Sequence, residues 1–96
     1  MSAEQTQDRI AALRAQIDAA DAAIAEAVAH RRSLSARIQE VRRTAGGPPR
    51  EPSREDVVVS AYAARLGHGG EAVGRAVLDA CLRPRTDRSG MLVPWG

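Results

Sequence analysis

Two arginines in the first half of the sequence have the spacing of an anion-binding site. Arg31 and Arg42 are 11 residues apart, close to three whole helical turns, so on a helix they point from nearly the same face about 16 Å apart. Two long guanidinium side chains can lean together over that separation and hold a small anion by bidentate hydrogen bonds. The spacing therefore predicts a site for a small anion.

Three further residues could complete such a site. Arg54 and Glu55 follow a loop short enough to fold back over the same end of the helix. Arg14 is about 25 Å from Arg31 along a helix and about 100° around it, so it cannot reach the same ligand from the same chain. In an antiparallel dimer, the first turns of one long helix lie beside the middle of the other. Such an arrangement would give two equivalent sites per dimer, each with one arginine, Arg14, from the partner chain.

An ordinary structural role is the competing interpretation of each of these charges. An arginine at the edge of an apolar row usually extends into solvent or pairs with an acidic neighbour. Arg31, however, stands where a row of isoleucines requires an apolar side chain, and burying a guanidinium is costly unless an anion meets it. His30 and His68 lack the spacing of metal ligands, and a single cysteine, Cys81, excludes a multi-thiolate metal site. We expect no metal.

One long helix must carry Arg14, Arg31 and Arg42. Residues from about 5 to 44 contain neither proline nor glycine and are rich in good helix formers. The large apolar residues of this stretch recur at heptad-like spacing in two rows, which we call the apolar seam. The seam consists of Ile10, Ile17, Ile24 and Ile38 in one row, and Leu13, Leu34 and Val41 in the other.

Two shorter helices are predicted at about 54–66 and 71–82. Ser53 is a favourable N-cap with acidic residues in the turn that follows it, and three glycines between positions 67 and 70 supply the next turn. Residues 85–96 are expected to form a flexible tail. The chain is thus predicted to be one all-α helical domain spanning 1–96.

The composition predicts how these helices are covered. The chain has 96 residues, no Phe, one Tyr and one Trp, so it has little apolar volume for a core of its own. Forty helical residues make a rod about 60 Å long, twice the diameter of about 30 Å expected for a compact chain of this length. We therefore expect three helices, one long and two short, intertwined as a homodimer.

Charge and hydropathy exclude several classes of protein. The formal net charge is +2, with all 14 basic residues arginine and 27% of residues charged. This mixed surface, without interleaved aromatic residues, argues against nucleic-acid binding. No apolar run approaches the length of a membrane span, and no signal peptide is evident. We expect a cytoplasmic protein without membrane contact.

The motif residues together resemble those of the all-α chorismate mutases. The resemblance covers about residues 10–82, and the loop and second helix are most similar to the small actinobacterial intracellular subclass. The motif is Ile10-x-x-Leu13-Arg14-x-x-Ile17-Asp18-x-x-Asp21-x-x-Ile24, then His30-Arg31-Arg32, Ile38, Arg42 and Ser53-Arg54-Glu55. The resemblance implies an intertwined three-helix homodimer and the isomerisation of chorismate to prephenate on the way to phenylalanine and tyrosine.

The implied reaction is an intramolecular Claisen rearrangement, which needs no cofactor. It needs a chair-like substrate conformer and positive charge beside the breaking ether bond. By resemblance, Arg31 and the partner's Arg14 bind the two carboxylates of the substrate, and Arg42 faces the ether oxygen as the main catalytic cation. Glu55 takes the ring hydroxyl, and Arg54 lines the pocket.

The third helix departs from the family pattern. Many members place a small hydroxyl residue there and, four positions later, a donor to the ether oxygen. Cys81 and Arg85 have that spacing and are the candidate substrate-binding residues, while a shifted alignment would place Val77 and Cys81 there instead.

The resemblance also implies a candidate protein partner, 3-deoxy-D-arabino-heptulosonate 7-phosphate (DAHP) synthase, which activates members of the actinobacterial subclass. An alternative function within the same fold is a mutase or lyase for a chorismate derivative, 4-amino-4-deoxychorismate or isochorismate. An alternative of another class is a helical dimerisation or adaptor module.

Overall fold

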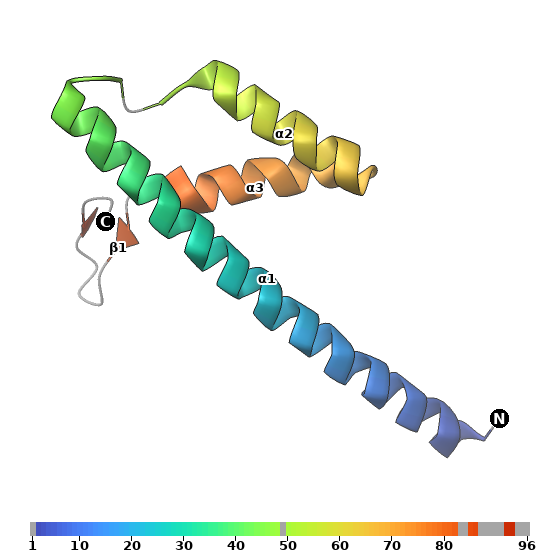
Figure 1. Cartoon of the computed structure of the whole chain (residues 1–96). Helices are drawn as coiled ribbons and strands as arrows, with labels where there is room; N and C mark the ends of the chain where they lie inside the picture. Colours follow the sequence, from blue (N-terminus) through green and yellow to red (C-terminus); the bar gives the residue numbers. More distant parts are fainter. Residues whose placement is uncertain (1, 49, 83–84, 87–91, 94–96) are drawn as a thin grey trace.

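The chain folds into three helices joined by two short connections (Figure 1). The computed structural model describes residues 2–48, 50–82, 85–86 and 92–93, the last four by backbone alone. Helix α1 spans Ala3–Ala45, α2 Pro52–Leu66 and α3 Gly70–Leu82. Each end lies within two residues of the predicted boundary, so the helical organisation expected from the sequence is confirmed.

Helix α1 is closed at both ends. Ser2 and Gln5 form a capping box, in which the Ser2 hydroxyl accepts from the Gln5 amide and the Gln5 side chain accepts from the Ser2 amide. Gly46 ends the helix with a positive φ of 75°, and the amide of Gly47 donates to the carbonyl of Arg42 at 2.8 Å. Both ends of the 43-residue helix thus have partners for their terminal peptide groups.

Helix α2 begins earlier than predicted. Pro52 is its first residue and Glu51 its N-cap, so the prediction of an N-cap at Ser53 is wrong. A proline is favourable at the first helical position because its missing amide hydrogen would have no helical partner there. Ser53 therefore lies within the first turn.

The core lies where α2 packs on α3. Val58, Val59 and Leu78 are buried there, with Tyr62 and Leu82 packed against them. Helix α3 also packs on α1. Helices α1 and α2 do not pack directly on each other, so α3 holds α2 beside the end of α1. The fold thus leaves space between α1 and α2.

Two glycines allow α3 to approach α2 closely. A Cβ at Gly70 would lie 2.5 Å from the carbonyl oxygen of Tyr62, and one at Gly74 would lie 3.1 Å from the Tyr62 Cβ. Gly70 was expected in the turn but is the first residue of α3. Its small size, rather than its backbone freedom, is what the fold requires.

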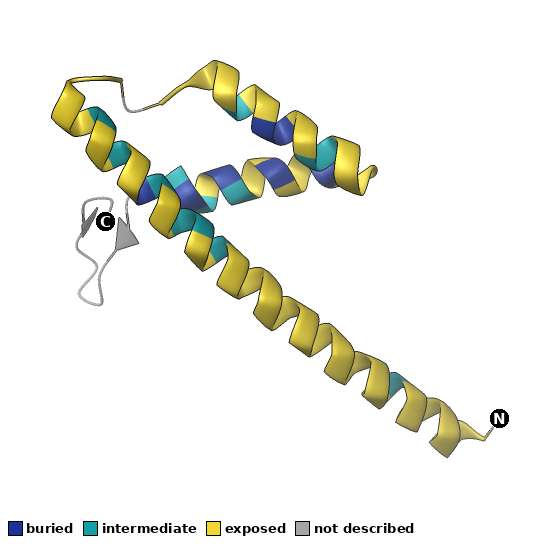
Figure 2. Cartoon of the chain, viewed as in Figure 1, coloured by how far each residue is buried: buried dark blue, intermediate teal, exposed yellow. Residues whose placement is uncertain are grey.

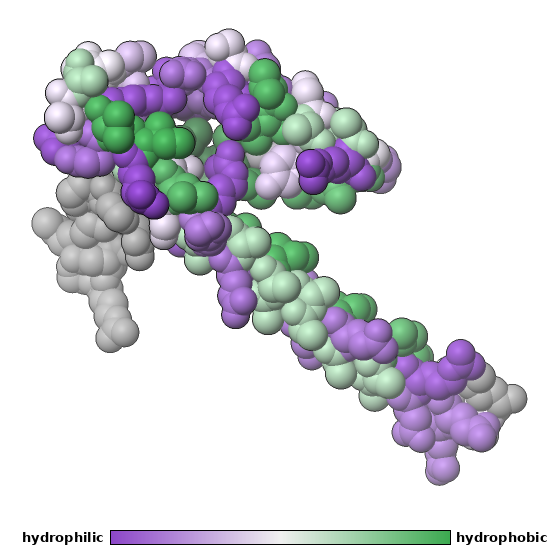
Figure 3. Space-filling view, in the orientation of Figure 1, coloured by the Kyte–Doolittle hydropathy of each residue, from purple (hydrophilic) through white to green (hydrophobic). Residues whose placement is uncertain are grey.

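The first half of α1 extends away from the rest of the chain as an arm (Figure 2). The longest dimension of the chain is 65 Å and its radius of gyration is 18.4 Å, against about 12 Å for a compact chain of this length. Figure 3 shows apolar surface recurring along the arm. Most of the apolar seam is exposed, including Leu13, Ile17 and Ile24 at 57–60%.

The tail contains a short backbone pairing. Strand β1, Arg85–Thr86, pairs antiparallel with β2, Leu92–Val93. These four residues are therefore paired through their backbones, and the rest of the predicted flexible tail lies outside the described residues. Among the helices that the structure describes, none is long and apolar enough to cross a membrane.

Candidate active site

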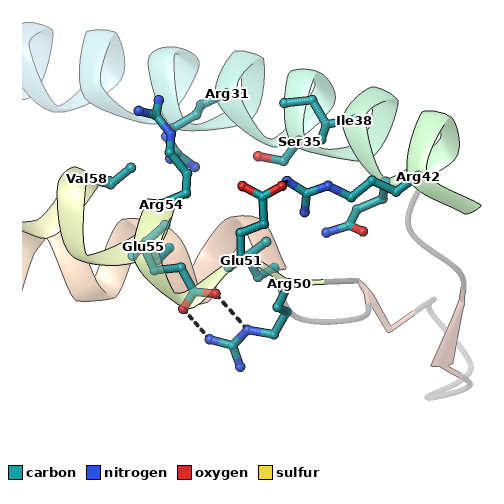
Figure 4. Close-up of a pocket in the computed structure, with 12 residues that line it drawn as sticks. Arg31, Ser35, Ile38, Arg42, Arg50, Glu51, Arg54, Glu55 and Val58 are labelled. Carbon is teal, nitrogen blue, oxygen red and sulfur yellow. Dashed lines mark hydrogen bonds and ion pairs between the residues drawn. The ribbon is translucent and has the colours of Figure 1, made fainter. Parts of the chain in front are cut away.

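A cavity of about 120 Å³ is lined by the second half of α1, the loop after it, α2 and α3 (Figure 4). Four of the residues predicted from the sequence line it together: Arg31, Arg42, Arg54 and Glu55. The remaining lining residues are Ser35, Ile38, Gln39, Arg50, Glu51, Val58, Leu78 and Leu82. The fold thus brings the predicted cations and carboxylate to one place.

Helix α1 supplies one wall of this cavity through its helical repeat. Residues 31, 35, 38, 39 and 42 recur every three or four positions and so share a face. Arg31 and Arg42 are both half-buried, and Figure 4 shows the Arg42 side chain extending toward Glu51 of the loop and the Arg31 side chain near Arg54 of α2. Leu78 and Leu82 of α3 and Val58 of α2 give the cavity an apolar side.

Arg42 meets a carboxylate from the loop. Its Nη2 lies 3.0 Å from Oε1 of Glu51, and the two side chains are 23% and 51% exposed. The guanidinium is therefore the more enclosed partner of this ion pair. This contact shows that a carboxylate can reach Arg42 from within the cavity.

Glu55 meets a guanidinium from the same loop. Arg50 donates from Nε to Oε2 at 2.9 Å and from Nη2 to Oε1, so both carboxylate oxygens are engaged. Glu55 is 20% exposed and Arg50 is 64% exposed. The hydrogen bonds from Arg50, followed by its charge, lower the pKa of Glu55, and burial opposes them only in part. Glu55 is therefore a carboxylate at neutral pH.

The charge of the cavity suits a dianion. Four arginines and two glutamates line it, which leaves a net charge of +2. Because the cavity is partly enclosed and has an apolar side, these charges are screened less than they would be on an open surface. A small ligand with two carboxylates would match this charge.

A second hollow of about 350 Å³ adjoins the cavity and shares Arg31, Arg54 and Val58 with it. Tyr62 and Arg65 extend it along α2, with exposed Val57 and the buried Val58 on its apolar side. The two hollows together form a groove beside α2 that is open in the single chain. Its mixed apolar and cationic lining suits a helix carrying both apolar and acidic residues.

Three predicted residues do not line the cavity. Arg14 is exposed on the arm of α1, away from the cavity of its own chain. Cys81 is 0% exposed and is not among the residues that line the cavity. On α3, Leu78 and Leu82 take that place. The side chain of Arg85 lies outside the described residues.

Four polar lining residues were not predicted as part of the site: Arg50 and Glu51 of the loop, and Ser35 and Gln39 of α1. Ser35 and Gln39 could have been found, since they continue the face of Arg31 at intervals of four residues. Arg50 and Glu51 could not, because nothing in the sequence fixes where a loop places its side chains. Among the described residues, no group of three or more His, Cys, Asp or Glu side chains could hold a metal ion.

Comparisons with known proteins agree on one family. A family model described as chorismate mutase type II matches residues 13–82. The fold is similar to a solved chain in the non-covalent complex of DAHP synthase and chorismate mutase from Corynebacterium glutamicum with bound transition state analogue. The TM-score is 0.76 at 25% identity, over 80% of this chain and 93% of that one. A search of curated proteins found no match.

Proposed function

Because the chain belongs to the type II chorismate mutase family, we infer that it rearranges chorismate to prephenate, and we propose which side chains carry the reaction. The rearrangement is intramolecular and forms no covalent bond to the protein. The enzyme must select the compact conformer of the substrate and stabilise the charge that develops as the ether bond breaks. A preorganised cationic cavity supplies both.

The convergence of Arg31, Arg42, Arg54 and Glu55 on one cavity is the observation that carries this proposal. These residues come from two helices and lie up to 24 positions apart in the sequence. The net charge of +2 matches the two carboxylates of chorismate. An adaptor module would have no need of so many arginines around one enclosed space.

We assign the polar groups of chorismate to these side chains as follows. Arg31 binds a carboxylate, and Arg42 faces the ether oxygen, where its charge lowers the barrier. Glu55 accepts the ring hydroxyl, and Arg54 lines the pocket beside it. Arg42 suits its role because it is the more enclosed partner of its ion pair, and a charge acts more strongly where water is excluded.

We further propose that the active form is an intertwined homodimer. The exposed apolar seam supports this, because a single chain leaves Leu13, Ile17 and Ile24 in water. The groove beside α2 is suited to the arm of a second copy, which carries Asp18 and Asp21 next to these apolar residues. In that arrangement, Arg14 of the partner chain completes each site.

The similar Corynebacterium glutamicum structure is a complex with DAHP synthase. We propose the corresponding synthase as a protein partner of this chain, with a cytoplasmic location and a role in aromatic amino acid biosynthesis. A pull-down with the synthase from the same organism, followed by an activity assay of the mixture, would test this. Activity unchanged by the synthase would argue against activation by this partner.

The substitution Arg42→Ala tests the catalytic assignment. We expect it to lower kcat/KM for chorismate by at least about a hundredfold, since removing one preorganised donor to a developing anion has an effect of that size. The dimer should remain intact by light scattering. The matched control is Arg43→Ala, which removes the neighbouring arginine and its exposed pair with Glu40. Near wild-type activity of Arg42→Ala would refute the mechanism.

Mixing two inactive variants tests the cross-chain site. A heterodimer of Arg14→Ala and Arg42→Ala chains holds one site with both arginines and one with neither. After subunit exchange, we expect recovery of up to about a quarter of the wild-type rate, since half of the re-paired symmetric dimers are mixed. No recovery despite proven exchange would exclude the partner's Arg14. Parallel assays with 4-amino-4-deoxychorismate and isochorismate define the substrate.

A further inference from the structure

Two adjacent loop residues face the cavity with opposite charges. Glu51 pairs with Arg42 of α1, and Arg50 pairs with Glu55 of α2. Figure 4 shows the Glu55 carboxylate turned toward Arg50, with both guanidinium donors on its two oxygens. Each oxygen retains a lone pair after such a bidentate contact. Glu55 can therefore still accept a hydroxyl while Arg50 holds it.

The charges around Glu55 change when a dianion binds. Helix α1 contributes two charged residues to the cavity, Arg31 and Arg42. The loop contributes Arg50 and Glu51, and α2 contributes Arg54 besides Glu55 itself. The described residues of α3 that line the cavity are the apolar Leu78 and Leu82. In the proposed complex, the substrate carboxylates occupy Arg31 and the partner's Arg14, and its ether oxygen faces Arg42. The two negative charges of the substrate then repel the Glu55 carboxylate.

In the proposed complex, Arg31 and Arg42 contact the substrate, and Arg50 is the arginine that stays paired with Glu55. Its guanidinium approaches from the solvent side, at 64% exposure, while Glu55 is mostly enclosed. We propose that Arg50 is a positioning residue, which holds the Glu55 carboxylate as the acceptor for the ring hydroxyl of the substrate. This inference rests on the proposed function.

The variants Arg50→Ala and Arg50→Lys test this role in the full chain. At neutral pH, we expect Arg50→Ala to raise KM for chorismate about two- to fivefold with a smaller change in kcat, the size expected for an exposed ion pair. Arg50→Lys should recover part of the loss, because it keeps the charge but not the bidentate geometry. Arg43→Ala is again the matched control, since Arg43 makes the same bidentate contact with Glu40 outside the cavity.

The pH profile separates positioning from a general structural effect. In the wild type, Arg50 lowers the pKa of Glu55, so the carboxylate persists as the pH falls. Without Arg50, that pKa rises toward or above its ordinary value, and Glu55 takes up a proton at higher pH. The acid limb of kcat/KM should therefore move to higher pH in Arg50→Ala and stay in place in Arg43→Ala. Superimposed profiles for the wild type and Arg50→Ala, or a gain in activity, would overturn the proposal.

A titration of Glu55 without substrate tests the role of Arg50 separately from the proposed function. The carboxyl carbon of Glu55 can be followed by nuclear magnetic resonance, with its signal assigned from its loss in Glu55→Gln. A wild-type protein that does not act on chorismate would refute the function and with it the role of Arg50 toward the hydroxyl. An active wild type in which Arg50→Ala leaves both the titration and the pH profile unchanged would refute the role of Arg50 alone.

Discussion

The two halves of α1 carry the same apolar periodicity but lie in different surroundings. In the second half, Ala36 is buried and Arg31, Ser35 and Gln39 are half-buried where α3 crosses the helix. In the first half, the arm, Ile17 and Ile24 are exposed to the same extent as ordinary surface residues. The seam residues Ile38 and Val41 of the second half are nevertheless 52% and 68% exposed, so α3 covers a different face and the seam stays open along both halves.

Acidic substitutions on the apolar face of the arm should have the largest effect on the molecule. We expect the double substitution Ile17→Asp/Ile24→Asp to abolish the dimer and the activity, because association would have to bury two unpaired carboxylates. Light scattering gives the oligomeric state, and circular dichroism shows whether α2 and α3 keep their structure. Ala22→Asp on the opposite face of the arm is the control. A dimer that persists in the double variant would show that the arm is not its interface.

At the end of the chain where the three helices are held together, stability should be most sensitive to substitutions at the contact between α2 and α3. Gly70→Ala places a Cβ 2.5 Å from the Tyr62 carbonyl oxygen and 2.8 Å from the Ala63 Cα, both backbone atoms that cannot move aside cheaply. We expect a loss of about 1–3 kcal/mol in the free energy of unfolding, measured by urea denaturation at fixed protein concentration.

Gly74→Ala and Gly47→Ala complete this series. Gly74→Ala should cost less than Gly70→Ala, because its nearest contact would be 3.1 Å. Gly47→Ala should cost least, because its nearest contact of 3.7 Å is an ordinary one. Equal stability of all three variants would contradict the close approach of α2 and α3.

Loss of the hydrogen bond between α1 and α3 should have the smallest effect on stability. Arg32 donates from Nε to the carbonyl of Ala80 at 3.1 Å, in a partly buried position. Arg32→Ala should lower the free energy of unfolding by about 0.5–1.5 kcal/mol, whereas Arg37→Ala, exposed on the same helix, should change it by less than about 0.5 kcal/mol. Urea denaturation of the pair measures the difference, and an equal loss in both variants would remove this bond as the cause.

The sequence predicted those parts of the molecule that depend on regular repeats. The three helices could be predicted from the helix-forming residues and from the glycines and prolines between them. The position of Arg31 and Arg42 on one face of α1 could be predicted from the helical repeat. Arg54 and Glu55 joined them because the loop is short. The requirement for Gly70 could not be predicted, since it depends on the distance between two helices. The roles of Arg50 and Glu51 could not be predicted either, since loop side chains have no periodic position.

The open end of α1 has a consequence for how the proposed enzyme behaves in a cell. Helix α1 spans most of the 65 Å length of the chain and carries Arg14 far from the cavity, so under the proposed cross-chain assignment one chain alone would hold no complete site. Below the dissociation constant of the proposed dimer, the reaction rate would rise with the square of the chain concentration. The abundance of the protein would then set its specific activity as well as its total activity.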